Sequence, residues 1–337
     1  MSRQSRRRIR FVAPGEADVV TEAAPTPAPD QVKVRSAYSA ISPGTERLVY
    51  QGDVPRSLPA DATIEALQGE DFDFPISYGY ACVGVVEEVG AEVDPDWEGV
   101  RVFAFQPHVS RFVTSPDALI RLPDAAALTD AVMIPSLETA VNLAMDGRPV
   151  IGEDVLVFGQ GIVGLLTVRL LADFPLASLT TVDPSGERRT KSMQLGADTS
   201  VAPPSAASSS PSPPNRADLV FELTGQPSVL NDAIALTHFD GLIVVGSWYG
   251  TKRAPIDLGG RFHRSRIEII SSQVSTIDPS FRGRWTKDRR MGVVLDLLDD
   301  VKPGRLISDR FELEEAPAVY EQLADGSSML QPVFVYE

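Results

Sequence analysis

A glycine motif of the form G-x-G-x-x-G is the feature of this 337-residue chain that points most directly to a chemistry. The apolar run 154–158 precedes it and a helical pattern of apolar residues, 162–172, follows it, which is the strand, turn and helix of a dinucleotide site. Its first glycine permits the tight turn, its second lets backbone amides approach a pyrophosphate, and its third lets helix and strand pack closely. The motif residues expected to contact the cofactor are Gly159, Gly161, Ile162, Val163 and Gly164.

An acidic residue stands where a dinucleotide site places its ribose contact. Asp183 ends the next apolar strand, 19 residues beyond Gly164. A carboxylate there hydrogen-bonds the 2′-hydroxyl of the adenosine ribose and repels a 2′-phosphate, so NAD is favoured over NADP. Arg188 and Arg189 follow closely, and either could contact the ribose or a phosphate, so NADP stays open.

The pattern of elements predicts two domains. Over 137–275 apolar strands alternate with helices, which is typical of a doubly wound parallel sheet, the Rossmann domain. Over 9–136 short β-branched runs are broken by Pro and Gly, which favours a mostly antiparallel β domain. The last stretch adds helices near 291–299 and 316–323 and a strand at 332–336. The predicted domains are 1–136 plus 276–337, and 137–275, with a Pro/Ser tract at 203–214 as a surface insertion.

Composition narrows the partners. The formal net charge of −15 argues against a nucleic-acid partner, because phosphates would be repelled. The sequence contains no run of about 18 apolar residues, so a membrane-spanning helix is not expected. The single cysteine, Cys82, excludes an internal disulfide and a multi-cysteine metal site and is expected to be an inert, buried thiol. A cytoplasmic protein fits this cysteine usage. The basic start, Arg3 to Arg10, is interpreted as a flexible leader into a first strand.

The order of these pieces resembles the medium-chain dehydrogenase/reductase superfamily, of the zinc-type alcohol dehydrogenase kind. The resemblance implies a GroES-like catalytic β domain with an inserted Rossmann domain, an NAD(P)-dependent oxidoreductase that acts on an alcohol or carbonyl, and a homodimer formed through edge strands of the Rossmann sheet. It covers nearly the whole chain. The segments that carry it are 41–46, 75–81, 84–90, 195–198 and 305–316.

The places that hold the catalytic zinc in that superfamily are occupied differently here. They match Ser42, Tyr80, Ala81 and Pro135, none of which is a usual zinc ligand, and the four-cysteine structural lobe is absent. We therefore expect no zinc and no other metal. The I-S-x-G-T-E loop and the Gly79-Tyr80 pair are similar to bacteriochlorophyllide dehydrogenase and its neighbours, a zinc-less branch.

Without a metal, hydroxyl groups must polarise or protonate the substrate oxygen. Thr45 matches the proton-relay position of the superfamily, and Ser42 and Tyr80 stand where ligands would be. Tyr80 is either a general acid or a structural side chain that fills the space that zinc occupies in the superfamily. His108 is either a proton relay or a solvated loop histidine, the latter being favoured. Glu46 is expected to support its loop through an arginine rather than act as a base.

The resemblance also implies further cofactor contacts. Thr139 matches the threonine that packs on the nicotinamide ring, with Val163 behind that ring. Gln331 replaces a basic residue that relatives often carry before their last strand. The remaining cofactor contacts are expected after the later sheet strands, at Thr224, Gly246, Ser247 and Ser272.

The sequence is also compatible with two other functions. The same scaffold reduces activated C=C bonds in enone and quinone reductases, where no metal is needed. A non-catalytic nucleotide-binding protein would also keep the glycine motif. The sequence itself does not identify the substrate beyond a small molecule.

Overall fold

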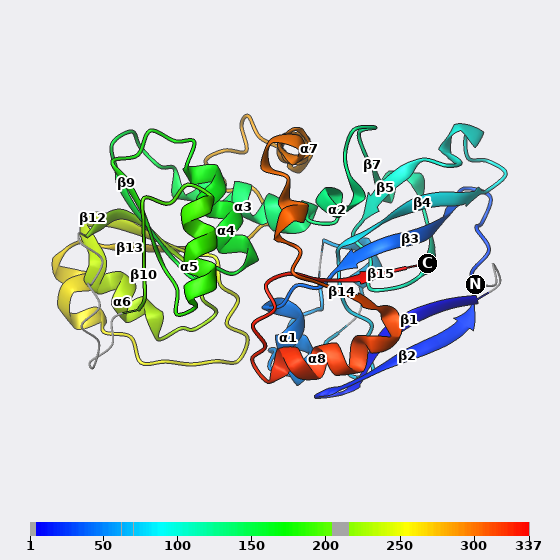
Figure 1. The fold of residues 1–337 in the computed structure, drawn as a ribbon, viewed down its shortest axis with the longest axis horizontal. Helices are drawn as coiled ribbons and strands as arrows, with labels where there is room; N and C mark the ends of the chain where they lie inside the picture. The colour runs from blue at the N-terminus through cyan, green and yellow to red at the C-terminus, as the bar shows by residue number, and fades with distance from the viewer. Residues whose placement is uncertain (1–4, 62, 70, 204–215, 337) are drawn as a thin grey trace. The chain divides into compact units, whose positions relative to one another are not determined.

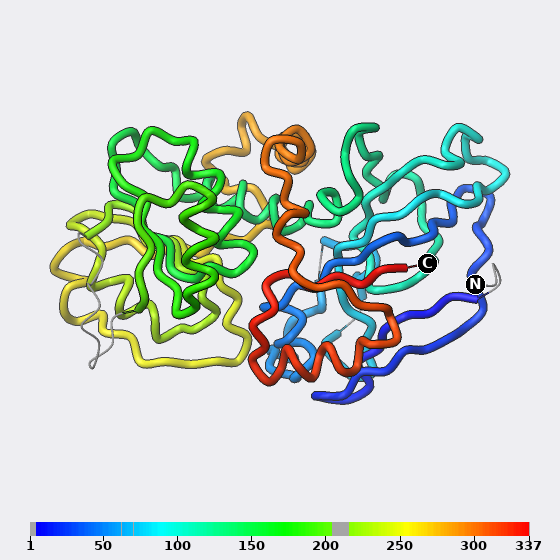
Figure 2. Tube along the Cα trace, viewed as in Figure 1, coloured from blue at the N-terminus to red at the C-terminus, as the bar shows by residue number. Residues whose placement is uncertain are grey.

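The chain folds into two compact units, described separately below. The computed structural model describes residues 5–61, 63–69, 71–203 and 216–336. The first unit, here called the β unit, comprises Met1–Pro135 and Leu295–Glu337; the second, the Rossmann unit, comprises Ser136–Val294. Both ends of the chain belong to the β unit, so the chain leaves that unit and returns to it (Figure 2).

The described part of the Rossmann unit is built on a six-stranded parallel sheet with the order β10-β9-β8-β11-β12-β13 (Figure 1). Numbered from the first strand of the unit, this is the order 3-2-1-4-5-6, in which the order reverses beside the first strand and leaves a crevice there for a ligand. The strands are β8 (Asp154–Phe158), β9 (Ser178–Val182), β10 (Thr199–Val201), β11 (Ala217–Glu222), β12 (Thr237–Val245) and β13 (Glu268–Ser271).

Strand β8 shows why the sheet needs helices on both faces. Val155 and Val157 belong to one apolar core, and Leu156 and Phe158 belong to another. Because side chains alternate along a strand, a continuous apolar run is stable only when both faces are covered. The helices are α3 (Ile134–Gly147), α4 (Ile162–Leu171), α5 (Gly186–Gln194), α6 (Val229–Leu236), the π-helical turn η4 (Leu258–Phe262) and α7 (Lys287–Val301), which runs into the β unit.

The β unit contains a mostly antiparallel sheet with the order β14-β15-β3-β4-β5-β7, with β6 paired to β3. One pair in it, β14 with β15, is parallel. The strands are β3 (Val32–Ala40), β4 (Cys82–Val89), β5 (Arg101–Ala104), β6 (Arg111–Thr114), β7 (Leu119–Arg121), β14 (Asp309–Glu312) and β15 (Pro332–Val335). The helices are α1 (Thr45–Gln51), α2 (Leu128–Ala131) and α8 (Ala316–Ala324), with short turns η1 (Glu65–Leu67), η2 (Pro95–Trp97), η3 (Pro116–Ala118), η5 (Pro303–Leu306) and η6 (Leu313–Glu315).

The basic start of the chain is a strand, so the expectation of a flexible leader is wrong for the described residues. Strand β1 (Ser5–Ala13) pairs antiparallel with β2 (Glu16–Ala23). Ile9 and Phe11 are buried in the core of the β unit, beside α8 and α1. Burying the Ile9 and Phe11 side chains stabilises the strand by roughly 3–5 kcal/mol.

The architecture confirms the predicted fold class, a doubly wound parallel sheet inserted in a mostly antiparallel β domain. The second crossing lies at 294/295, whereas the sequence places it at 275/276. The difference arises because Arg290, on α7, donates hydrogen bonds to Glu138 and Asn142 of α3 and so ties 276–294 to the Rossmann unit. Apart from Pro203, the predicted insertion 203–214 lies outside the described residues.

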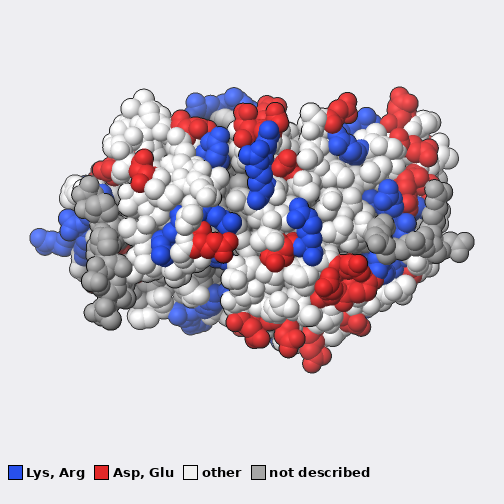
Figure 3. All heavy atoms as spheres, in the orientation of Figure 1, with Lys and Arg blue, Asp and Glu red and all other residues white. Residues whose placement is uncertain are grey.

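Surface properties agree with the composition. Within the described ranges, no helix has the length and apolarity that crossing a bilayer requires. On the face shown in Figure 3, acidic and basic side chains are interspersed, and the basic ones do not merge into one continuous surface.

Candidate functional site

The glycine motif of the Rossmann unit lies between β8 and α4, and each glycine meets a different constraint. A Cβ on Gly164 would lie 1.9 Å from the Gly159 carbonyl oxygen, so only glycine lets α4 start this close to the turn. Gly159 has a φ of +89°, and a Cβ on it would lie 2.6 Å from the Leu223 carbonyl oxygen. A Cβ on Gly161 would meet no protein atom within 4 Å. Packing thus explains the first and third glycines, and the open space at the second suits the approach of a ligand.

Asp183 closes this edge of the sheet. Its two carboxylate oxygens accept backbone N–H groups, one from Gln160 at 2.7 Å and one from Ser185 at 2.8 Å. Each oxygen can accept a further hydrogen bond, so a diol remains a suitable partner. Arg189 donates to the carbonyls of Asp183 and Pro184. Arg188 is half-buried on α5, and its backbone N–H donates a hydrogen bond to the Ser185 hydroxyl oxygen at 3.3 Å.

A buried glutamate organises the next strand end. Glu222, the last residue of β11, accepts a hydrogen bond from the Thr224 N–H at 2.8 Å and one from the Tyr249 hydroxyl at 2.5 Å. Ser247 accepts the Gly225 N–H at 2.8 Å and donates to the Glu222 carbonyl. Thr224 and Ser247, both expected at a cofactor site, are therefore held by one network at the carboxyl end of the sheet. Sequence reasoning missed Glu222 and Tyr249, although a charge ending an apolar strand was a usable signal.

Three other predicted cofactor residues lie in different surroundings. Gly246 is required by packing, because a Cβ there would be 2.6 Å from Leu223. The Ser272 hydroxyl donates to Asp146 at 2.7 Å and accepts from Asn142 at 2.9 Å, so the protein already uses it. Thr139 is half-buried on α3.

The motif itself is largely enclosed. Ile162 is buried, and half-buried Val163 packs against the core that α4 covers. Gln160 is fully buried, and its Oε1 has no hydrogen-bond partner among the described residues. An orphaned acceptor, a glycine with free space and a carboxylate with spare acceptor capacity together fit a nicotinamide dinucleotide.

In the β unit, the three predicted hydroxyl residues come together. Ser42 and Thr45 lie at the start of α1, and Tyr80 lies just before β4. Burial raises the pKa of the Tyr80 phenol to about 12, and hydrogen bonds from the Ser42 and Thr45 side chains oppose that rise. The nearby charge of Glu46 raises it further. Tyr80 therefore keeps its proton at neutral pH and serves as a hydrogen-bond donor.

Beneath this hydroxyl cluster lies a chain of buried polar groups. The Glu46 carboxylate accepts the Ser42 N–H at 2.7 Å, the Tyr320 hydroxyl at 2.5 Å and the His108 Nε2–H at 2.8 Å. With its proton on Nε2, His108 accepts from the Ser39 hydroxyl at Nδ1, 2.6 Å away. The chain described here, from Tyr320 through Glu46, His108 and Ser39 to Tyr336, is called the Glu46 network; its last link, Ser39 to Tyr336, is 2.7 Å.

The Glu46 network corrects two expectations. His108 is fully buried, so the favoured interpretation as a solvated loop histidine is wrong. Glu46 does support its loop, but through His108 and Tyr320 rather than through an arginine. Burial raises the pKa values of both terminal phenols, Tyr320 and Tyr336, so they remain donors. Sequence reasoning missed these two tyrosines and Ser39.

Other residues of the β unit take structural roles. The buried Gln331 amide donates to the Ile41 carbonyl at 2.8 Å and so holds the loop that carries Ser42. Cys82 is buried, as expected, and burial raises the pKa of its thiol to about 12, which makes it a poor nucleophile. Among the described residues, no group of three or more His, Cys, Asp and Glu side chains is placed to hold a metal ion.

The structure thus combines a Rossmann-type unit that carries a glycine motif with a β unit that carries a cluster of hydroxyl side chains. No family model matches the chain. It is 23% identical to the starvation-sensing protein RspB of Escherichia coli K12, over 93% of this chain and 95% of the relative. It is 27% identical to (R,R)-butanediol dehydrogenase of Bacillus subtilis strain 168, over 75% of this chain and 78% of the relative.

Solved structures show the same fold. The alcohol dehydrogenase rspB of Escherichia coli CFT073, in complex with NADH, superposes with a TM-score of 0.77 at 20% identity, covering 99% of this chain and 100% of that one. The 2R,3R-butanediol dehydrogenase of Bacillus subtilis gives 0.77 at 19% identity, covering 98% and 100%. A dehydrogenase of Sinorhizobium meliloti 1021 bound to NADP gives 0.75 at 18% identity, covering 99% and 100%.

Each of these three structures covers at least 98% of this chain, so the similarity in fold extends over both units.

The glycine geometry predicts opposite behaviour for two single-methyl substitutions. Gly161→Ala places its methyl in open space, so the melting temperature should stay within about 1 °C while NADH binding weakens about tenfold or more, since the ligand needs that space. Gly164→Ala drives a methyl into a carbonyl oxygen and should destabilise folding by about 3 kcal/mol. Thermal melts and NADH titration by fluorescence check both, and unchanged NADH affinity in Gly161→Ala would contradict the assigned role.

Proposed function

We propose that this protein is a zinc-independent, NAD-preferring oxidoreductase that interconverts an alcohol and a carbonyl compound, with NADP as a poorer cofactor. The observation that carries the proposal is the cluster of Ser42, Thr45 and Tyr80, in which the two smaller side chains lie close enough to the phenol to oppose the rise in its pKa that burial causes. When bound, the nicotinamide supplies or accepts a hydride at the carbon that carries the substrate oxygen.

The protein's own contribution is to manage the charge on that oxygen. A carbonyl oxygen becomes negative as its carbon is reduced, and a preorganised donor stabilises it. Tyr80 is such a donor, because burial and the Glu46 charge hold its proton. Ser42 and Thr45 stabilise the negative charge that forms on Tyr80 as its proton moves toward the substrate, and Thr45 is the proposed relay. The raised pKa keeps Tyr80 protonated at neutral pH, where it can donate a hydrogen bond to the substrate oxygen, although it also makes the phenol a weaker acid.

The donor set supports zinc independence. Zinc requires thiolate, neutral imidazole or carboxylate ligands. At the matching places this chain offers a serine hydroxyl, a protonated phenol, an alanine and a proline. The nearest carboxylate, Glu46, already accepts three hydrogen bonds, and the His108 ring is bonded through both nitrogens. These residues do not fit a catalytic zinc.

Cofactor choice rests on Asp183. Its carboxylate is fixed by two backbone N–H groups at the end of β9, where a 2′-phosphate would meet its negative charge. Arg189 is engaged with two backbone carbonyls, which limits its use as a counter-charge for that phosphate. NAD is therefore the proposed cofactor.

Removing the hydroxyls should slow turnover without weakening cofactor binding. Tyr80→Phe and Thr45→Ala are each expected to lower kcat for NADH-dependent carbonyl reduction about a hundredfold, the range for a lost proton-transfer or oxyanion donor. Tyr78→Phe is the matched control, since its ring contacts Tyr80 but its hydroxyl has no part in the cluster. Absorbance at 340 nm over a panel of aldehydes, ketones and enones provides the assay.

Two outcomes of that assay would overturn the proposal. Turnover of enones alone would make the protein a C=C reductase. Tight NADH binding with no turnover of any compound in the panel would make it a nucleotide-binding protein. Undiminished kcat in Thr45→Ala would remove that residue from the relay.

Activity should be indifferent to chelators. Dialysis against EDTA or 1,10-phenanthroline should leave kcat within about twofold, because the hydroxyls need no Lewis acid. Elemental analysis of the active protein should find well under one zinc per chain. Stoichiometric zinc, with activity lost on chelation and restored by zinc alone, would refute zinc independence.

Neutralising Asp183 should relax cofactor choice. Asp183→Asn removes the charge and keeps one of the two oxygen acceptors for the backbone N–H groups, so the ratio of NADP to NAD affinity should rise about tenfold. Asp198→Asn is the matched control, because Asp198 also accepts a backbone N–H from β9, at Leu179 near the start of that strand. Equal changes in both variants would show that overall charge, not Asp183, sets the preference.

A further inference from the structure

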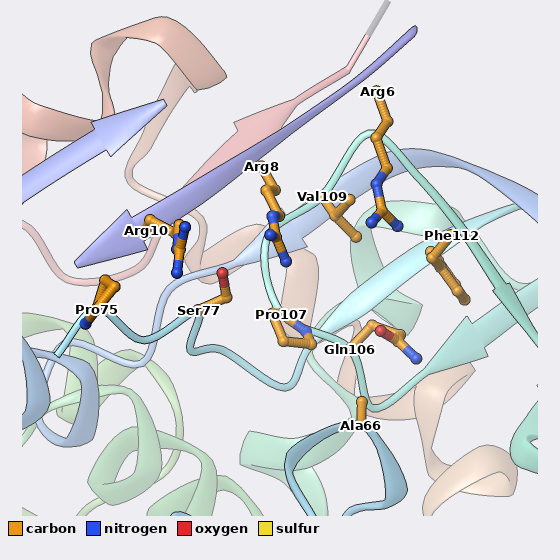
Figure 4. Close-up of a pocket in the computed structure, with 10 residues that line it drawn as sticks. All are labelled: Arg6, Arg8, Arg10, Ala66, Pro75, Ser77, Gln106, Pro107, Val109 and Phe112. Carbon is orange, nitrogen blue, oxygen red and sulfur yellow. The ribbon is translucent and has the colours of Figure 1, made fainter. Parts of the chain in front are cut away.

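Strand β1 presents two unlike faces. Ile9 and Phe11 point into the core of the β unit. The alternate residues Arg6, Arg8 and Arg10 line a cavity of about 300 Å³ (Figure 4). Residues two apart on a strand are separated by about 7 Å, so three guanidinium groups share one small space. Like charges at that spacing repel each other unless an anion lies between them.

The protein itself neutralises this charge only in part. Glu22, across the strand pair from Arg6, places one oxygen 2.9 Å from Nε of Arg6 and 2.9 Å from Nε of Arg8. The contact to Arg6 is a hydrogen bond, whereas the buried Nε of Arg8 lacks hydrogen-bond geometry to any partner. Among the described residues, the Arg10 side chain has neither an ion pair nor a hydrogen bond. Glu22 thus forms ion pairs with two of the three guanidiniums, and Asp18, which lies across the strand pair from Arg10, forms none with it.

The opposite wall offers a further polar group. Gln106 lines the cavity, and in the described structure its side-chain amide makes no hydrogen bond. Figure 4 shows the three arginine side chains directed to the same side of β1, toward the segments of Ser77 and Pro107. The lining does not include Ser42, Thr45 or Tyr80, so the cavity is distinct from the hydroxyl cluster.

We propose that this cavity binds a multiply charged oxyanion, a phosphate or a polycarboxylate, held by the guanidiniums of Arg8 and Arg10 with Arg6 beside them and Gln106 opposite. Planar guanidinium groups bind such oxygens through paired N–H donors. The volume admits a small anion or the charged end of a larger ligand. The surplus positive charge in a chain of net charge −15 supports a specific site rather than general attraction of anions.

Calorimetry on the full chain tests the site, with pyrophosphate, inorganic phosphate and citrate as probes. NADH is kept saturating, because the glycine motif could itself bind pyrophosphate. At low ionic strength we expect one saturable site. Arg10→Gln should weaken binding about tenfold or more, the loss expected for a charged hydrogen-bonding partner. Pyrophosphate binding without citrate binding assigns the site to phosphates, and the reverse assigns it to carboxylates; either result supports it.

Two further variants separate a built site from diffuse charge. Arg7→Gln makes the same charge change one residue away, on the face of β1 that pairs with Glu314, and should alter affinity less than twofold. Glu22→Gln removes the competing carboxylate and should tighten binding several-fold. Equal weakening in Arg7→Gln and Arg10→Gln, no gain in Glu22→Gln, or no saturable binding to the unmodified protein would overturn the proposal.

Discussion

A carboxylate with no exposed surface is the constraint on which the β unit's site depends. Burying an ionised carboxylate costs several kcal/mol unless its oxygens receive hydrogen bonds. Glu46 receives three, from the Ser42 backbone, from His108 and from Tyr320. These donors come from the loop before α1, the segment after β5 and helix α8. Satisfying one charge thus brings three distant segments to a common point, and the hydroxyls of Ser42 and Thr45 flank that point because they flank Glu46 in sequence.

The same constraint places Tyr80. His108 can reach Glu46 only because Gly79 leaves room for its ring, since a Cβ on Gly79 would lie 2.9 Å from the imidazole. Gly79 has a φ of +124°, a conformation that other residues rarely adopt. Tyr80 follows directly, so the turn that admits the histidine also carries the phenol to Ser42 and Thr45. The Gly79-Tyr80 pair therefore acts as one unit, in which the first residue makes space and the second supplies the donor.

The sequence predicts the Rossmann unit well because its signals are local. The motif between Gly159 and Gly164 acts within one turn, and β8 is an apolar run whose predicted bounds, 154–158, agree with the structure. The Glu46 network had no such signal, since His108 is 62 residues from Glu46 and Tyr320 is 274. A lone histidine in a Gln-Pro-His loop resembles a solvated one until the fold supplies its partners. Likewise, strand β1 was not recognised over its arginines, because only Ile9 and Phe11 alternate with them and two apolar residues are a weak strand signal.

Electrostatics connects this architecture to the kind of chemistry the site can perform. Burial raises the pKa of Tyr80 and the charge of Glu46 adds to that rise, so the group that orders the loop also favours the protonated phenol. A metal site needs the reverse, lone pairs freed by deprotonation and directed at one point. A buried carboxylate whose oxygens already accept hydrogen bonds from the protein cannot also ligate a cation without leaving those donors unsatisfied. In the proposed function, the hydroxyls at the places of the metal ligands and the buried Glu46 beneath them act together, because this set of groups donates protons to a developing anion and offers no free lone pairs to a cation.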